Sequence, residues 1–134
     1  MIDSQPDWFK KALSVKKEQK IIEVEEGEIF YQHWGDKSKP GIVLVHGSGS
    51  HSHWWDFIAP QLLETFQVSA IDLSGMGESS HRGDYSPELY AKEILSVAED
   101  SGFFQVGKPI ICGHSMGGFM TATAGYITDK ELTG

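Results

Sequence analysis

A serine framed by glycines is the residue of this chain whose setting most directly suggests chemistry. Ser115 lies in the run Gly113-His114-Ser115-Met116-Gly117, between the apolar residues 110–112 and a stretch of helix-forming residues. A sharp turn between a strand and a helix projects a serine hydroxyl clear of the backbone, and the flanking glycines leave room for so tight a bend. Unpaired N–H groups at the start of the helix stabilise negative charge beside the hydroxyl. The pattern predicts nucleophilic attack by Ser115.

A second glycine-containing loop is expected to lie close to this serine. Residues 42–45 form an apolar run typical of a strand buried on both faces in a parallel sheet, and His46-Gly47-Ser48-Gly49-Ser50 follows it. Its glycines free the backbone to turn N–H groups toward the serine. The alternative is a phosphate-binding loop, which is not supported because no Gly-Lys-Ser/Thr sequence follows the glycines.

These two motifs resemble the α/β-hydrolase superfamily, and Gly-His-Ser-Met-Gly-Gly is similar to its esterase, lactonase, haloperoxidase and carbon–carbon hydrolase branches. The resemblance implies an acyl-enzyme on Ser115 and a small ester, lactone or related carbonyl compound as substrate. It implies an oxyanion hole made by the N–H groups of Met116 and Ser48, with Gly49 as the second candidate. Serine argues against epoxide hydrolases and haloalkane dehalogenases, which have aspartate there. The alternative is a buried Gly-Ser turn without chemistry.

The same resemblance implies that an acidic residue and a histidine follow the serine. No histidine follows Met116, and the acids Asp129 and Glu131 belong to a polar tail. Residues 1–134 are therefore interpreted as the N-terminal half of a single α/β-hydrolase domain, truncated before the triad acid and histidine and inactive or very weak alone. The other class left open is a non-catalytic α/β-hydrolase-like small-molecule binding protein or an inactive fragment. Upstream histidines are the remaining candidates for a base: His46, His51, His53 and His81.

The predicted fold class is α/β, a partial α/β-hydrolase fold with an opening hairpin, then parallel strands with flanking helices. Residues 20–24 and 28–34 are rich in β-forming residues and flank Glu25-Glu26-Gly27, which indicates a hairpin. A helix and connector occupy residues 1–19, further strands are expected at 42–45, 66–72 and 110–112, and helices at about 54–64, 87–100 and 116–128. Ser52 and Ser86 are the expected helix caps.

Trp54 and His114 are assigned to the substrate pocket. For Trp54 the alternative is a core residue, and the elbow is expected to turn His114 away from the Ser115 hydroxyl and toward the protein. Asp72 resembles the family residue that ties its loop together through backbone hydrogen bonds, rather than the triad acid. Gly75-Met76-Gly77 lacks the third glycine of a dinucleotide fingerprint, so no nucleotide cofactor is expected.

The net charge indicates which kinds of partner the chain can bind, and the N-terminal sequence indicates its location in the cell. The net charge of −8 disfavours nucleic acid and anionic membranes, which leaves a small-molecule substrate. A short helix at residues 7–13 is expected to pack on the domain, with a membrane-surface anchor as the alternative. The first twenty residues lack the apolar core of a signal peptide, and no stretch could span a bilayer, so a cytoplasmic location is expected.

Three further expectations concern cysteine, metals and self-association. The single Cys112 cannot form an internal disulfide and is expected to be buried in its strand. No metal is expected, because the clustered histidines of residues 46–53 lack a carboxylate at a clear ligand spacing. The strand before Ser115 would form an unpaired apolar sheet edge, through which copies of the chain could associate.

Overall fold

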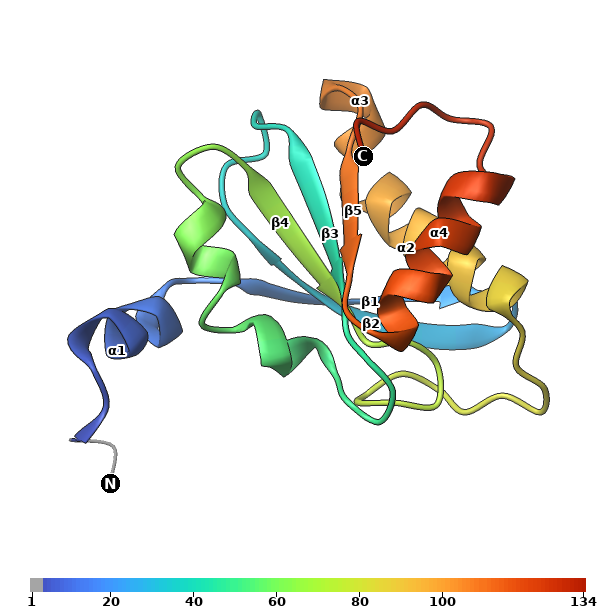
Figure 1. The fold of residues 1–134 in the computed structure, drawn as a ribbon, viewed down its shortest axis with the longest axis horizontal. Coiled ribbons are helices and arrows are strands. Elements are labelled where there is room, and N and C mark those ends of the chain that lie inside the picture. Colours follow the sequence, from blue (N-terminus) through green and yellow to red (C-terminus); the bar gives the residue numbers. More distant parts are fainter. Residues whose placement is uncertain (1–3) are drawn as a thin grey trace.

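The chain folds around one five-stranded sheet (Figure 1). The structure, a computed structural model, describes residues 4–134; residues 1–3, which belong to the predicted N-terminal segment, lie outside the described residues. In chain order the elements are α1 (Asp7–Ser14), β1 (Glu18–Val24), β2 (Gly27–Trp34), β3 (Gly41–Val45), η2 (Ser52–Trp55), η3 (Ala59–Leu62), β4 (Gln67–Ile71), α2 (Pro87–Asp100), α3 (Phe103–Val106), β5 (Ile110–Gly113) and α4 (Met116–Ile127). The labels η2 and η3 denote short 3-10 helices.

The strand pairing confirms the predicted α/β class. The strand order is β1-β2-β4-β3-β5. β2 pairs antiparallel with β1 and with β4, whereas β3 pairs in parallel with both β4 and β5. The carboxyl ends of β3, β4 and β5 therefore meet at one edge of the sheet, where open α/β sheets bind their ligands.

The hairpin turn differs in detail from the prediction. Glu25 and Glu26 have φ of 48° and 64°, so these two residues make the turn, and Gly27 pairs with Val24 in the strand ladder. A side chain at Gly27 would collide with the guanidinium group of Arg82. Glycine is therefore needed here for close approach and not for the turn itself.

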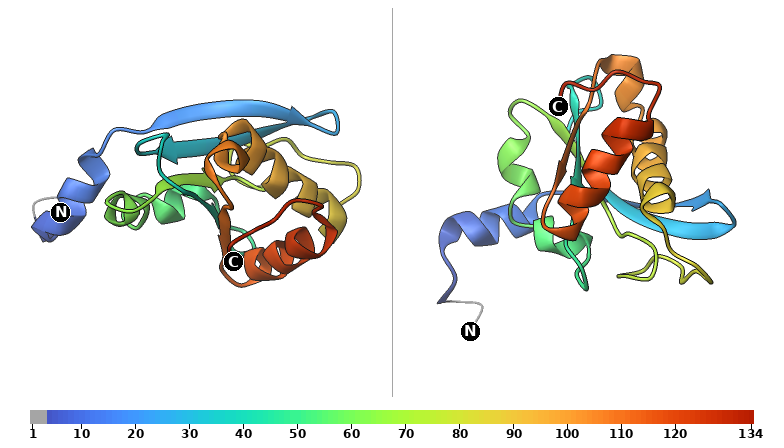
Figure 2. Two further views of the ribbon diagram at one scale, coloured as in Figure 1. Left: turned by 90° about the horizontal axis from the view of Figure 1, so that it is seen from above. Right: turned by 45° about the vertical axis from the view of Figure 1, so that its right-hand side comes forward.

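Helices cover both faces of the sheet (Figure 2). Along β3, Val43 and Val45 join the core cluster beneath α2 and α4, whereas Ile42 and Leu44 join the cluster that contains Trp55 of η2. Alternate side chains of a strand point to opposite faces, so this division shows that β3 is buried on both sides. The expectation of a central, doubly covered strand is confirmed.

The predicted helix at residues 54–64 is wrong, because this segment forms η2 and η3 instead. Pro60 has no backbone N–H to donate to a continuous helix, and it lies in the first turn of η3. Ser52 is not a cap. Its N–H donates to Asp72 Oδ1 at 2.6 Å, inside η2. Trp55 and Ala59 are nevertheless buried.

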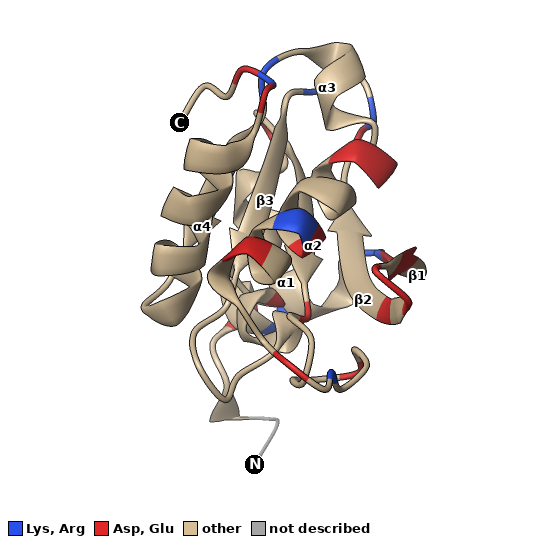
Figure 3. Cartoon of the chain, turned by 90° about the vertical axis from the view of Figure 1, so that its right-hand side faces the viewer, with Lys and Arg blue, Asp and Glu red and all other residues tan. Residues whose placement is uncertain are grey.

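The two long helices agree with the sequence. The Ser86 hydroxyl accepts a hydrogen bond from Leu89 N–H at 3.1 Å and caps α2, which ends at Asp100. α4 ends at Ile127. It carries no Lys, Arg, Asp or Glu and is drawn in tan throughout in Figure 3. None of the helices in residues 4–134 is long and apolar enough to cross a membrane.

Cys112 is exposed, so the expectation of a buried thiol is wrong. Its neighbour Ile111 faces the core beneath α2 and α4, which turns Cys112 to the opposite face of an outer strand. The last residues of the chain run beside the start of β5 (Figure 1): Thr133 N–H donates to Pro109 O at 2.9 Å, and Ile111 N–H donates to Gly134 O at 3.0 Å. The edge of β5 is thus partly paired within the chain.

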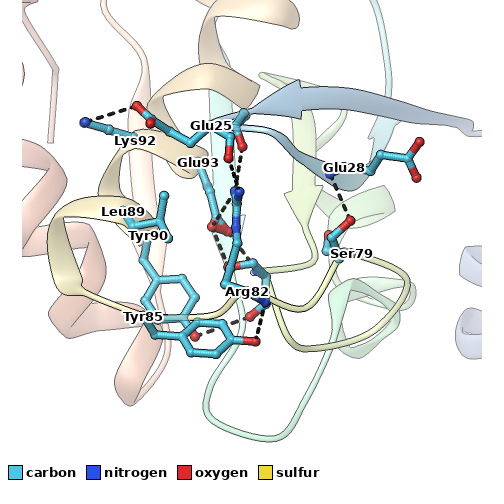
Figure 4. Close-up of polar contacts among 12 residues, drawn as sticks. Glu25, Glu28, Ser79, Arg82, Tyr85, Leu89, Tyr90, Lys92 and Glu93 are labelled. Carbon is cyan, nitrogen blue, oxygen red and sulfur yellow. Dashed lines mark hydrogen bonds and ion pairs between the residues drawn. The ribbon is translucent and has the colours of Figure 1, made fainter.

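A buried arginine fixes the long loop between β4 and α2 (Figure 4). The Arg82 guanidinium donates to the carbonyls of Glu25 and Val24 at 2.6 and 2.7 Å, and lies 3.8 Å from the carboxylate of Glu93. Glu93 in turn accepts two hydrogen bonds from Ser74, each 2.8 Å long. Burial raises the pKa of Glu93. The loop is thereby joined to both the hairpin and α2.

Candidate active site

Ser115 occupies a strained turn between β5 and α4. Its φ of 55° and ψ of −122° lie outside the regions that residues other than glycine normally adopt. A side chain at Gly113 would collide with the carbonyl of Gly117, and one at Gly117 would collide with the carbonyl of His46. The glycines are needed because α4 approaches β5 and β3 closely. The strand–turn–helix predicted around Ser115 is present.

The first N–H groups of α4 point back toward this turn. The amide of Gly117 donates to the His114 carbonyl and the amide of Gly118 donates to the Ser115 carbonyl, both at 2.9 Å. Met116 is the first residue of α4, so its N–H has no acceptor within the helix. Met116 therefore stays the predicted donor of this N–H at the start of α4.

The loop after β3 shares a cavity with Ser115. Gly47 lies against the elbow, since a Cβ atom built on it would be 3.4 Å from Ser115 Cβ. The cavity measures about 190 Å³ and is lined by Gly47, Ser48, Ser50, Trp54, His114 and Ser115. The structure thus brings Ser48 together with Ser115 at the carboxyl ends of adjacent parallel strands. Gly49 is not among the lining residues; it adopts φ of 68° in the same turn.

Trp54 and His114 form one wall of this cavity. The Trp54 side chain is 50% exposed, and its ring stacks on that of His114 with centroids 6.2 Å apart and 23° between the planes. The cavity interpretation of Trp54 thus agrees with the structure better than the core interpretation. The expectation that His114 turns into the protein is wrong, because its ring is exposed and lies over Gly47. The space beneath the elbow is already filled by the backbone of β3.

His46 cannot act as the missing base. Its ring is buried, Leu73 N–H donates to Nε2 at 3.0 Å, and Nδ1 lies 2.7 Å from the Gly47 carbonyl. Since Nε2 accepts a hydrogen bond, the proton of the neutral ring is on Nδ1, which donates to Gly47. Burial lowers the pKa of His46 and favours this neutral form. Nε2 thus joins the loop after β3 to the loop after β4, and Nδ1 bonds within the loop after β3.

Comparison with known proteins identifies the family. The sequence profile described as the alpha/beta hydrolase family matches residues 42–131, which include both the Ser48 loop and the elbow. The chain belongs to the α/β-hydrolase family.

Relatives of this α/β hydrolase include esterases. An uncharacterised protein of Mycobacterium bovis is 37% identical over 93 residues, which cover 66% of this chain and 26% of that protein. A pimeloyl-[acyl-carrier protein] methyl ester esterase of Klebsiella pneumoniae is 33% identical over 91 residues, or 68% of this chain and 33% of the esterase. A thioesterase domain from the curacin biosynthetic pathway superposes with a TM-score of 0.76 and 25% identity, over 87% of this chain and 42% of that domain. The chain thus spans less than half the length of these relatives.

Asp56 supports the site of this α/β hydrolase in a way that the sequence did not reveal. Its carboxylate accepts hydrogen bonds from Gln32 Nε2 at 3.0 Å and pairs with His53 Nδ1 at 2.8 Å and Lys17 Nζ at 3.0 Å. Gln32 also donates to Ser52 Oγ at 3.1 Å. These contacts fix η2, which carries Trp54. The only local signal in the sequence is the three-residue spacing of His53 and Asp56, because Gln32 and Lys17 are distant in sequence.

No base or metal site accompanies Ser115 in the part of the chain that the structure describes. Within residues 4–134, the Ser115 hydroxyl makes no hydrogen bond, and no three His, Cys, Asp or Glu side chains gather as metal ligands. The Asp72 carboxylate accepts hydrogen bonds from the N–H groups of Ser52 and Glu78, at 2.6 and 2.9 Å. It therefore ties its loop together, as the sequence predicted, and is not an orienting acid for a histidine.

Proposed function

We propose that this chain carries the nucleophile of a serine hydrolase that cleaves a small ester, lactone or related carbonyl compound. The observation that carries this proposal is the strained backbone of Ser115, whose side chain opens into the cavity shared with Ser48. Strain of this kind persists where the surrounding structure holds it, and it concentrates at functional sites. The K. pneumoniae esterase and the curacin thioesterase domain support the choice of an ester-like substrate.

The proposed reaction proceeds through an acyl-enzyme. Ser115 Oγ attacks the carbonyl carbon and gives its proton to a base, and the alcohol leaves with a proton. Water then cleaves the ester to Ser115 and releases the acid. We propose that the acid and histidine of the triad come from outside this chain. The N–H groups of Met116 and Ser48, with Gly49 as the second choice, would stabilise the oxyanion, and one such donor contributes about 10²–10³-fold in rate.

The remaining features of the proposal concern location and partners. Neither a cofactor nor a metal is required by this chemistry. The net charge of −8 supports a protein that binds neither nucleic acid nor anionic membranes, and the polar first twenty residues support a cytoplasmic location. Pairing between the outer edges of β5 in two copies is proposed as the mode of self-association, where the terminal residues leave that edge free.

Covalent labelling tests the nucleophile without requiring turnover. A fluorophosphonate probe reacts with a serine hydroxyl in an oxyanion site, so we expect slow labelling of the chain at Ser115, measured by intact mass and peptide mapping. Ser115→Ala should abolish labelling, whereas Ser50→Ala, which removes a hydroxyl from the same cavity, should retain it. Labelling that spreads over several serines, or survives Ser115→Ala, would contradict the proposed nucleophile.

Turnover by the 134-residue chain should be very weak. Losing a triad histidine costs about 10⁶-fold in a comparable serine enzyme, whereas an oxyanion hole alone retains roughly 10³-fold over water. We therefore expect hydrolysis of p-nitrophenyl acetate barely above background, with little change in Ser115→Ala. Efficient turnover that depends on Ser115 would show that a base is present. His53 would then be the first candidate, because its Nδ1 is held by Asp56 and its Nε2 is available.

A further inference from the structure

Trp54 is exposed, and the backbone that carries its ring is held in place. Half of the residue's surface is accessible, yet its backbone N–H donates to His51 O at 3.2 Å and the adjacent Trp55 is buried. Ser52, two residues earlier, is joined to Asp72 at 2.6 Å, and Asp56, two residues later, is fixed by three partners. An aromatic ring that is carried on a fixed backbone and already packs on a neighbouring ring loses less conformational entropy when it binds a ligand.

The surroundings of Trp54 define what such a ligand would be. The ring stacks on His114, one residue before the nucleophile, and both side chains line a cavity of about 190 Å³. The other lining residues are glycine and serine, so the wall carries no Lys, Arg, Asp or Glu that would pair with a charged ligand. Ligand pockets usually measure about 300–1,000 Å³, so this wall has room for a small group only.

We propose that Trp54 and His114 form a platform that binds a small, uncharged, planar aromatic group of the substrate, beside the carbonyl that Ser115 attacks. The position of the carbonyl rests on the proposed function of Ser115. A planar aromatic ring can extend the stacked pair of Trp54 and His114, whereas a saturated ring of the same size is thicker and lacks the electrostatic attraction between aromatic rings. The protein's net charge of −8 also repels anionic substrates. The platform therefore selects aromatic over saturated neutral substrates.

Equilibrium binding tests the platform without any reaction. Benzamide and cyclohexanecarboxamide share one carbon skeleton and a carbonyl group, and differ in the planarity and aromaticity of the ring. We expect benzamide to bind about 2- to 10-fold more tightly in NMR titrations of the 134-residue chain, with the largest shifts at Trp54 and His114. Trp54→Leu should remove the difference. Trp8→Leu, which alters a tryptophan that is 55% exposed on α1, should retain it.

The outcomes separate the platform from the hydrolase. Equal affinity for the two amides, or a preference that survives Trp54→Leu in a folded variant, would overturn the platform. Ser115→Ala should keep the benzamide preference, because the hydroxyl does not form the wall. If Ser115 resists the fluorophosphonate but the preference depends on Trp54, the hydrolase proposal fails and the platform stands. If Ser115 is labelled and both amides bind equally, the platform fails and the hydrolase stands.

Discussion

Two loops follow neighbouring parallel strands at the same edge of the sheet, and they differ in how their polar groups are hydrogen-bonded within the protein. Side-chain hydrogen bonds join the loop after β4, residues 72–86, to the rest of the protein: the Asp72 carboxylate accepts two amides. Arg82 donates to two carbonyls (Figure 4). The loop after β3, residues 46–50, has one internal backbone hydrogen bond, from Ser50 N–H to Gly47 O at 3.3 Å. Gly47, Ser48 and Ser50 of this loop border the cavity at Ser115.

This difference separates a supporting loop from a binding loop. A polar group that is already paired inside the protein gains nothing from a ligand, whereas an unpaired N–H beside a cavity is available to one. His46 connects the two loops through Leu73, so the loop after β4 holds the loop after β3 in position. Substitutions in the loop after β4 should therefore change stability, and substitutions in the loop after β3 should change binding.

The largest stability effect is expected at Asp72. Asp72→Ala removes the acceptor of two amides, and hydrogen bonds to a charged group contribute about 1.5–3 kcal/mol each, so the free energy of unfolding should fall by about 3–6 kcal/mol. Ser48→Ala, in the other loop, should change it by less than about 0.5 kcal/mol, because the substitution keeps the backbone N–H that is the proposed donor. Urea denaturation measures both. Equal losses would show that the two loops do not differ.

A glycine in each loop gives a matched comparison. Gly77 and Gly49 have φ of 56° and 68°, a conformation that costs an alanine about 1–2 kcal/mol. A Cβ atom at Gly77 would collide with the Asp72 carboxylate, whereas one at Gly49 meets no atom within 4 Å. Crowding adds about 1–3 kcal/mol, so Gly77→Ala should lower the unfolding free energy more than Gly49→Ala does. Equal costs in urea denaturation would show that the Asp72 contact is unimportant.

The histidine that joins the loops should make stability depend on pH. Burial lowers the pKa of His46 and of His33, so the unfolded chain takes up protons near pH 6.5, at about the ordinary pKa, while the folded chain does not. The stabilisation is therefore complete above about pH 6.5 and is lost as the pH falls through the lowered values. Glu93 acts in the opposite sense, because its pKa is raised.

A variant isolates the contribution of His46. His46→Gln retains an acceptor for Leu73 N–H but does not titrate, so its unfolding free energy should fall less between pH 7.5 and pH 5.5 than that of the unsubstituted chain. His33 and Glu93 are unchanged in this comparison and cancel. An identical pH dependence of the two urea midpoints would show that His46 does not couple the loops to protonation.

The sequence predicted the parts of the site that depend on local backbone requirements. Ser115 between two glycines, and the Ser86-Pro87 start of α2, each need particular residue types within a few positions, so the pattern is visible without tertiary structure. Asp72 was predicted for the same reason, since a short carboxylate at the end of a strand bonds nearby amides. These features are confirmed because residues close together in the sequence determine them.

The features that the sequence did not predict depend on contacts between distant segments. Residues 54–64 have helical spacing, but the pairing of Ser52 with Asp72 and the position of Pro60 divide this segment into η2 and η3. Cys112 has a buried strand pattern, yet β5 lies at the outer edge of the sheet. His114 turns outward because β3 occupies the space beneath the elbow. In each case tertiary packing overrides the local pattern.

The smallest expected effect tests whether the elbow stores strain for function. Ser115 adopts φ of 55° and ψ of −122°, a backbone conformation that costs a residue other than glycine about 1–3 kcal/mol. Glycine adopts this conformation without strain, but it loses more backbone entropy on folding, at a cost of about 0.5–1 kcal/mol. Ser115→Gly should therefore gain about 1 kcal/mol of unfolding free energy while losing fluorophosphonate labelling. Ser48→Gly is the matched control, because Ser48 lines the same cavity without a positive φ, and it should lose up to about 1 kcal/mol. A higher free energy of unfolding for Ser115→Gly, together with a lower one for Ser48→Gly, would show that the strained backbone that positions the Ser115 hydroxyl reduces stability. Equal losses in thermal and urea unfolding would mean that the elbow is no more strained than the loop beside it.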